Sequence, residues 1–198
     1  MTKVLFYSLL ISLILGAFNR FQITNSIAIN FSDIVASIFL LYSLIKYQPL
    51  KQKFLKTYFI WVTAIFIVFI LSLVPHIIST PLSELAVGIL YPIRYYIYFL
   101  LPLSLIPFYQ QNKISKDHIS ITFLIISLIG LAQFAIIPNL QFLEQYGYDP
   151  HYYRLVSTWL DPNFLGAALV IALLITYRNF QKKPINIFML VIIFVSLV

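Results

Sequence analysis

Long apolar blocks dominate the chain, and charged residues almost never interrupt them. The blocks run near residues 4–18, 27–45, 57–78, 85–108, 119–137, 163–177 and 185–198. A helix that crosses the hydrocarbon core of a bilayer needs about 20 predominantly apolar residues, and most of the blocks approach that length. The sequence therefore predicts an all-α fold, a polytopic transmembrane helical bundle of about seven segments that forms a single domain over residues 1–198.

The composition excludes an ordinary soluble domain. Hydrophobic residues make up 61% of the chain and charged residues only 10%, whereas about 25% charged residues is usual in soluble domains. The formal net charge of +7 does not indicate a nucleic-acid partner, because the basic residues stand in the short loops between the blocks. The chain has no cysteine, and no residue cluster has the spacing of a metal site. We expect no disulfide, metal or cofactor.

The Lys and Arg residues predict the orientation, because cytoplasmic loops of membrane proteins are enriched in them. With the N-terminus in the cytoplasm, ten of the 13 face inside, two face outside, and Arg94 lies within a block. Those inside are Lys3, Lys46, Lys51, Lys53, Lys56, Lys113, Lys116, Arg178, Lys182 and Lys183; those outside are Arg20 and Arg154. Lys3 and block 4–18 also resemble a signal peptide. Because no small-residue cleavage site follows, we interpret the block as a retained first helix, with cleavage as the alternative.

The last block runs into Val198 without a polar anchor. Its helix would have about 14 residues and a length of roughly 21 Å, less than the hydrocarbon thickness of a bilayer. We therefore expect that the chain is the N-terminal part of a longer protein.

Prolines predict where helices end or bend. Pro49, Pro107, Pro138 and Pro184 lie at or just beyond block edges, where the missing N–H costs least. Pro92 and Pro102 fall inside block 85–108 and predict kinks there.

Asp33 and Arg94 are charged residues inside apolar blocks, and a charge at membrane depth is a functional candidate. Asp33 lies about seven residues, or roughly 10 Å, from the outer end of its block. Arg94 lies about nine residues, or roughly 14 Å, from the outer end of its own. Two interpretations remain open. The residues form a structural ion pair, or Arg94 attracts an anion into an outward-facing polar cavity.

Residues 138–162 form the longest loop, which the orientation places outside. Six of its residues are aromatic: Phe142, Tyr146, Tyr148, Tyr152, Tyr153 and Trp159. They fit an aromatic belt at the headgroup level, or a platform for a sugar or lipid headgroup, and the two are compatible.

The end of this loop carries the strongest binding signal. Asp161 or Asn163 can cap the helix that follows, and Pro162 suits its first turn. Free N–H groups at a helix N-terminus favour a phosphate, and Arg154 adds a fork that holds two phosphate oxygens. The competing interpretation is a capped helix start with Arg154 paired to Asp149 or Asp161.

The pattern Arg-x-x-x-Thr-x-x-(Asp/Asn)-Pro-Asn, followed by an apolar helix, resembles the O-antigen ligase and O-antigen polymerase superfamily of bacterial envelope enzymes. Here it reads Arg154, Thr158, Asp161, Pro162 and Asn163, followed by Phe164, Leu165 and Gly166. The many short-looped helices, the outside loop before the pattern and the stretch Tyr91–Tyr96 around Arg94 are similar as well. The likeness covers essentially the whole chain.

This resemblance implies the N-terminal part of a membrane-embedded glycosyltransferase of the bacterial inner membrane, without a nucleotide-sugar domain. Its donor would be a saccharide linked to undecaprenyl pyrophosphate, and its acceptor another lipid-linked glycan or lipid A–core. Arg154 would contact the pyrophosphate, while Thr158 and Asn163 would shape the helix start. Arg94 as a second anion contact is inferred from its depth. The family's catalytic histidine and further arginines would lie beyond Val198, so residues 1–198 alone are expected to be inactive.

Two other functions stay open. A polysaccharide flippase or another transporter would use Asp33 and Arg94 along a substrate path, although internal repeats and Gly-rich broken helices are not evident. In a non-catalytic membrane protein every polar residue would be structural.

Overall fold

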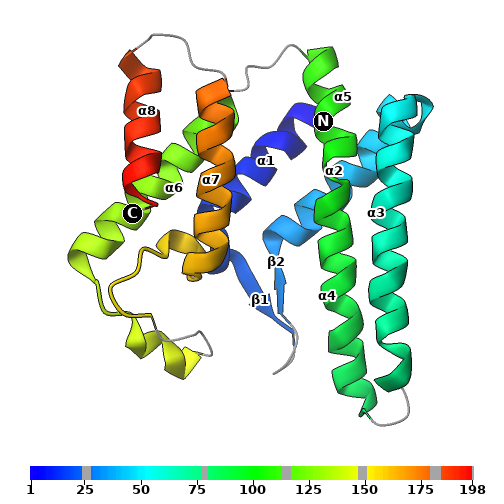
Figure 1. The fold of residues 1–198 in the computed structure, drawn as a ribbon, viewed down its shortest axis with the longest axis horizontal. Coiled ribbons are helices and arrows are strands. Elements are labelled where there is room, and N and C mark those ends of the chain that lie inside the picture. Colours follow the sequence, from blue (N-terminus) through cyan, green and yellow to red (C-terminus); the bar gives the residue numbers. More distant parts are fainter. Residues whose placement is uncertain (24–27, 77–79, 113–116, 147–150, 179–183, 198) are drawn as a thin grey trace. The chain divides into compact units, whose positions relative to one another are not determined.

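The structure is a computed structural model that describes residues 1–23, 28–76, 80–112, 117–146, 151–178 and 184–197 (Figure 1). Helices account for most of it, with short 3-10 turns labelled η. The elements are α1 (Thr2–Leu15), η1 (Gly16–Asn19), β1 (Arg20–Gln22), β2 (Ala28–Asn30), α2 (Phe31–Tyr47), η2 (Pro49–Lys51), α3 (Lys53–Ser72), η3 (Val74–His76), α4 (Leu82–Leu100), α5 (Pro102–Asn112), α6 (Asp117–Ile136), η4 (Gln141–Tyr146), η5 (Ser157–Trp159), α7 (Pro162–Arg178) and α8 (Pro184–Val195).

The chain forms two compact units. Unit 1 comprises Met1–Leu9 and Arg20–Ile114, and unit 2 comprises Leu10–Asn19 and Ser115–Val198. Helix α1 contributes its first part to unit 1 and its last part to unit 2. Each unit is described by itself, and the prediction of one transmembrane domain stays a prediction.

Among the described residues, four helical stretches are long and apolar enough to cross a membrane: Thr2–Asn19, Lys53–His76, Glu84–Gln111 and Asp117–Ile136. They indicate a membrane protein. The other predicted blocks form α2 and α7, with 17 residues each, and α8, with 12. These are shorter than the roughly 20 residues of a typical span. The structure thus confirms an apolar, mostly helical protein, whereas about seven spans are not confirmed.

The all-α prediction was wrong in one detail, a small antiparallel hairpin in unit 1. Strand β1 pairs with β2 through Arg20–Asn30, Phe21–Ile29 and Gln22–Ala28. In β1 the polar residues Arg20 and Gln22 flank the apolar Phe21, a period of two that suits a strand better than a helix. Block 27–45 was therefore read too long, because α2 begins only at Phe31.

The fourth block is interrupted at Pro102, where a kink was predicted. Pro102 divides the block into α4 and α5, where it occupies the first position of α5. A proline is tolerated there because the N–H at that position has no partner within the helix. Pro92 lies inside α4. Pro107 was wrongly placed at a block edge, since α5 continues past it to Asn112.

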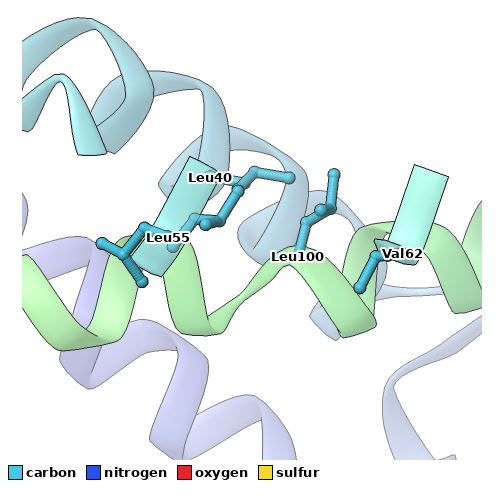
Figure 2. Packing of buried hydrophobic residues seen from close by; sticks show 5 residues of the cluster. Leu40, Leu55, Val62 and Leu100 are labelled. Carbon is cyan, nitrogen blue, oxygen red and sulfur yellow. The ribbon is translucent and has the colours of Figure 1, made fainter. Parts of the chain in front are cut away.

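Each unit has its own packed centre. In unit 1, α3 and α4 run side by side (Figure 1), and leucine and valine side chains from α2, α3, α4 and α5 meet. Figure 2 shows this cluster: Leu40, Leu55, Val62, Leu100 and Leu103. In unit 2, α6, α7 and α8 join through Ile126, Leu165, Leu169, Ala172 and Ile193. Within a bilayer such contacts act mainly through van der Waals packing, because lipid tails are as apolar as the side chains.

Candidate functional site

Unit 1 brings the predicted intramembrane charges together. A terminal nitrogen of Arg94, Nη2, lies 2.8 Å from Oδ2 of Asp33. The two side chains expose 31% and 14% of their surface, respectively. Asp33 is the third residue of α2, in its first turn. The helix starts four residues later than the predicted block, so Asp33 lies near the helix start, while its depth in a membrane stays a prediction.

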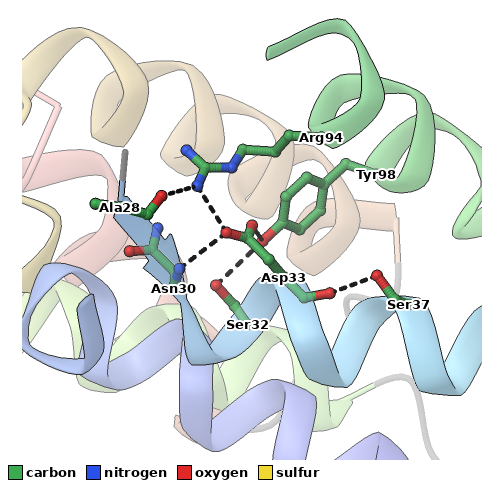
Figure 3. A network of polar contacts seen from close by, with 7 residues as sticks. All are labelled: Ala28, Asn30, Ser32, Asp33, Ser37, Arg94 and Tyr98. Carbon is green, nitrogen blue, oxygen red and sulfur yellow. Dashed lines mark hydrogen bonds and ion pairs between the residues drawn. The ribbon is translucent and has the colours of Figure 1, made fainter. Parts of the chain in front are cut away.

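Both carboxylate oxygens of Asp33 accept hydrogen bonds (Figure 3). Oδ1 accepts from the hydroxyl of Tyr98 at 2.8 Å, and Oδ2 accepts from the backbone N–H of Asn30 at 2.9 Å. The Tyr98 hydroxyl also lies 3.1 Å from Oγ of Ser32. A carboxylate at the third helical position that bonds back to the N-cap N–H stabilises the helix start. Asp33 therefore holds the beginning of α2 and fastens it to α4.

The guanidinium of Arg94 also contacts the hairpin, since Nη2 donates to the carbonyl oxygen of Ala28 at 2.7 Å. The contacts of Arg94 with Asp33 and Ala28 both use this one nitrogen, and the other guanidinium nitrogens point away from Asp33 (Figure 3). The adjacent carboxylate cancels the charge of Arg94, which weakens its attraction for an anion. The geometry thus favours the structural interpretation of Arg94, and its contact with an anion stays a prediction.

In unit 2, the residues after Arg154 do not run along a surface. Residues Leu155–Trp159, which we call the inserted segment, pack against α6, η1 and α7. Val156, Ser157 and Thr158 are 0%, 3% and 5% exposed. Irregular backbone at membrane depth is tolerated only where protein groups satisfy its polar atoms. The hydrogen bonds of this segment therefore decide whether it is stable.

Three hydrogen bonds anchor the inserted segment. Ser157 Oγ donates to the carbonyl oxygen of Ile126 at 2.7 Å, and the indole N–H of Trp159 donates to the carbonyl oxygen of Leu13 at 2.8 Å. The backbone N–H of Val156 donates to Oε1 of Gln133 at 3.3 Å. Both sides of the segment are thus attached, one to α6 and the other to the last part of α1.

Two glycines make room for the segment. A Cβ on Gly16 would lie 2.4 Å from the carbonyl oxygen of Thr158, and Gly16 itself has a left-handed φ of +53°. A Cβ on Gly130 would lie 2.5 Å from Cδ2 of Leu155 and 3.1 Å from Cβ of Ser157. Both glycines are needed for close approach, and no pattern in the sequence indicated them, because the five glycines of the chain are scattered.

The backbone around the segment is strained. Tyr153, Ser157 and Leu160 have φ angles of 49°, 52° and 55°. The left-handed conformation costs roughly 1–2 kcal/mol for a residue other than glycine. Such strain persists only where the surroundings hold it, and it tends to gather at functional sites.

Arg154 is exposed and has no ion-pair or hydrogen-bond partner among the described residues. Asp149, one of its two predicted partners, lies outside the described residues. The other, Asp161, faces the helix instead. Its Oδ1 accepts from the backbone N–H groups of Asn163 at 2.8 Å and Phe164 at 3.0 Å. Within the part of the chain that the structure describes, the guanidinium of Arg154 is exposed and is not paired with Asp161.

This cap corrects the expected phosphate site at the start of α7. The carboxylate of Asp161 already occupies the N–H groups that a phosphate would use, and its negative charge would repel the phosphate. The helix start does not serve as an anion site while Asp161 caps it. Asn163 is exposed at the second position of α7.

Thr158 faces the interior of unit 2, and its Oγ1 is buried with no hydrogen-bond partner among the described residues. Asn19 Oδ1 and His151 Nε2 are buried in the same way, with no partner in the described part of the chain. Buried polar atoms are normally paired, often by an ordered water molecule. Thr158 therefore belongs to the interior of this region, where only 5% of its surface is exposed.

The aromatic residues of the loop divide into two groups. Phe142, Tyr152 and Tyr153 are 49%, 51% and 63% exposed, as a platform or an interfacial belt requires. Trp159 instead packs inward, with its ring centroid 6.2 Å from that of Phe123. Tyr148 and the side chain of Tyr146 lie outside the described residues.

The described residues contain no group of three or more His, Cys, Asp or Glu side chains that could hold a metal ion. Comparisons with protein-family models, with curated proteins and with solved structures find no match to this chain.

Proposed function

We propose that this chain is part of a bacterial membrane glycosyltransferase that polymerises or ligates saccharides carried on undecaprenyl pyrophosphate. The observation that carries the proposal is the exposed guanidinium of Arg154, which has no ion-pair partner among the described residues and directly precedes a buried and strained segment. An arginine fork binds two phosphate oxygens at once, as a pyrophosphate offers them. The order of residues from Arg154 to Asn163 further supports the resemblance to the O-antigen ligase and polymerase superfamily.

In this proposal Arg154 binds the pyrophosphate of the donor. The acceptor hydroxyl oxygen forms a bond to C1 of the donor sugar, and the bond between C1 and the phosphate oxygen breaks. Undecaprenyl pyrophosphate leaves with the electron pair, and the positive charge of Arg154 stabilises the negative charge that develops on it. The hydroxyl proton passes to a base that the resemblance places beyond residue 198.

The reaction requires Arg154 to face the outer side of the inner membrane. We propose about seven spans with the N-terminus in the cytoplasm, which the unequal distribution of the Lys and Arg residues supports. The aromatic residues Tyr152 and Tyr153 would then meet the glycan or the lipid headgroups on that side. Thr158, Asn163 and Asp161 would shape the surroundings of Arg154, and Asp33 and Arg94 would fasten the hairpin to α4.

The test is binding of undecaprenyl pyrophosphate to the purified chain in lipid nanodiscs, measured by native mass spectrometry. Arg154→Ala is compared with Arg178→Ala, which removes another exposed arginine, from the predicted inner side. Loss of one charge-assisted bidentate contact should weaken binding roughly tenfold to a hundredfold in Arg154→Ala only. Equal binding by the two variants would remove the proposed site.

Transfer and transport are separated by their products. The gene with its natural downstream sequence is expressed in cells that supply the lipid-linked glycan. New glycosidic bonds that disappear in Arg154→Ala support the glycosyltransferase. Movement of the glycan across the membrane without new bonds would identify a transporter instead.

A further inference from the structure

The inserted segment fixes where the backbone of Arg154 can lie, because its buried anchors begin two residues further on at Val156. We infer that Gly16 and Gly130 are positioning residues, which let the segment seat between α6 and the end of α1 and thereby set the position of Arg154. This inference rests on the proposed function for its link to the anion. The position of the inserted segment is a property of the fold, and it can be measured without any lipid ligand.

Gly16 is the more restrictive of the two residues. An added Cβ would meet backbone atoms, Thr158 O at 2.4 Å and Thr158 C at 2.7 Å, and also Cδ1 of Trp159 at 2.8 Å. Backbone atoms move only if the whole segment moves. The φ of +53° adds a second reason for glycine, since other residues rarely adopt it. Alanine at position 16 must therefore push η5 away from η1.

Gly130 restricts the segment on the side of α6. Its added Cβ would meet the side chain of Leu155, with Cδ2 at 2.5 Å and Cγ at 3.1 Å. The clash involves a side chain, so removal of that side chain should relieve most of it. Leu155→Ala thus offers a rescue for Gly130→Ala, whereas no side chain can be removed to rescue Gly16→Ala completely.

The position of the inserted segment can affect anion binding, because an arginine recognises a phosphate only when its guanidinium is correctly placed. A bidentate contact needs both N–H groups within hydrogen-bond distance of the phosphate oxygens. Displacing a binding group by about 1 Å can lower the rate of an enzyme a hundredfold. The left-handed residues Tyr153 and Ser157 lie on either side of Arg154 and Val156, so an unseated segment would relax to another backbone path.

The experiment uses Val156→Cys as a reporter, since Val156 is 0% exposed and the chain has no other cysteine. The labelling rate by a maleimide is measured in nanodiscs for this variant alone and with Gly16→Ala, Gly130→Ala or Gly88→Ala. Gly88 is the matched control, because its nearest contact for an added Cβ is an ordinary 3.6 Å. We expect labelling to accelerate about tenfold or more with Gly16→Ala and Gly130→Ala, and to stay unchanged with Gly88→Ala.

Two further readouts separate positioning from general destabilisation. Leu155→Ala should return the labelling rate of the Gly130→Ala protein toward that of the reporter alone. Undecaprenyl pyrophosphate should slow the labelling of Val156→Cys, because a ligand that prefers the seated segment stabilises it. That protection should vanish with Arg154→Ala, and Gly16→Ala should weaken binding of the lipid about tenfold.

The outcomes distinguish the two proposals. If Gly16→Ala leaves the labelling rate of Val156→Cys unchanged, Gly16 does not hold the inserted segment in place. This result would overturn the inference whether or not the lipid binds. Faster labelling with undiminished lipid binding in Gly16→Ala overturns the positioning of Arg154. Lipid binding that is insensitive to Arg154→Ala contradicts the proposed function. The labelling rates still show, independently of the lipid, whether Gly16 and Gly130 hold the inserted segment in place.

Discussion

Asp33 and Asp161 both stabilise helix starts, but they differ in the other contacts that they make. Each carboxylate lies at a helix start and accepts backbone N–H groups, Asp33 that of Asn30 and Asp161 those of Asn163 and Phe164. Only Asp33 also binds an arginine and a tyrosine from another helix. Asp161 therefore acts within its own helix, whereas Asp33 joins α2 to α4.

The link between Asp33 and Tyr98 leads to a prediction about stability. Tyr98→Phe removes the hydroxyl that donates to Asp33 Oδ1 and should lower the free energy of unfolding by about 1 kcal/mol. Tyr95→Phe is the matched control on the same helix, because the Tyr95 side chain is 44% exposed. It should leave stability nearly unchanged. Thermal unfolding in detergent micelles measures both, and equal losses would contradict the link.

The cap at Asp161 leads to a second prediction. Asp161→Ala leaves the N–H groups of Asn163 and Phe164 without a side-chain acceptor, which should cost about 1 kcal/mol. Asp161→Asn keeps an acceptor oxygen and should retain most of the stability. Amide hydrogen exchange in the first turn of α7 should accelerate in the alanine variant alone. Identical exchange in both variants would show that the cap does not hold the helix start.

Helices were the elements that the sequence predicted well, because apolar runs are a strong signal. Blocks 57–78 and 119–137 correspond to α3 and α6, with boundaries displaced by a few residues. The start of α2 was missed because the hairpin strand Ala28–Asn30 continues the apolar run of the helix. The strand Ala28–Asn30 forms because it pairs with residues 20–22. The periodicity of the apolar run that follows gives no information about this pairing.

The outer face of α3 leads to a prediction at the element scale. Leu55 and Val62 are the only buried residues of α3, and Trp61 is 66% exposed. The chain has two tryptophans, so each can be observed alone. In vesicles of brominated lipids, fluorescence should be quenched strongly in Trp159→Phe, which keeps Trp61, and weakly in Trp61→Phe. Equal quenching would contradict either the lipid exposure of α3 or the inward packing of Trp159.

At the scale of the whole molecule, the sequence located the candidate site but not its structure. The residue order from Arg154 to Asn163 identified the region. The burial of Val156, Ser157 and Thr158 could not be predicted, because it depends on Gly16 and Gly130, which are distant in sequence. The pairing of Asp33 with Arg94 was one of two open interpretations. The predicted depths of the two residues allowed an ion pair, but its formation depends on tertiary contacts that the sequence does not show.

The two candidate anion-binding arginines lie in different units and in different surroundings. Unit 1 holds the neutralised arginine Arg94, whose partner Asp33 is almost buried. Unit 2 holds Arg154, which is exposed beside the inserted segment. The proposed recognition of a lipid pyrophosphate therefore depends on the side of the membrane that Arg154 faces.

The most direct measurement is the reaction of single cysteines with a membrane-impermeant maleimide in right-side-out spheroplasts. Arg154→Cys and Arg178→Cys are suitable, because both positions are exposed and the chain has no other cysteine. The account predicts that position 154 reacts in intact spheroplasts and position 178 only after the membrane is permeabilised. Position 154 reacting only after permeabilisation would contradict the outward-facing arginine and the function proposed from it.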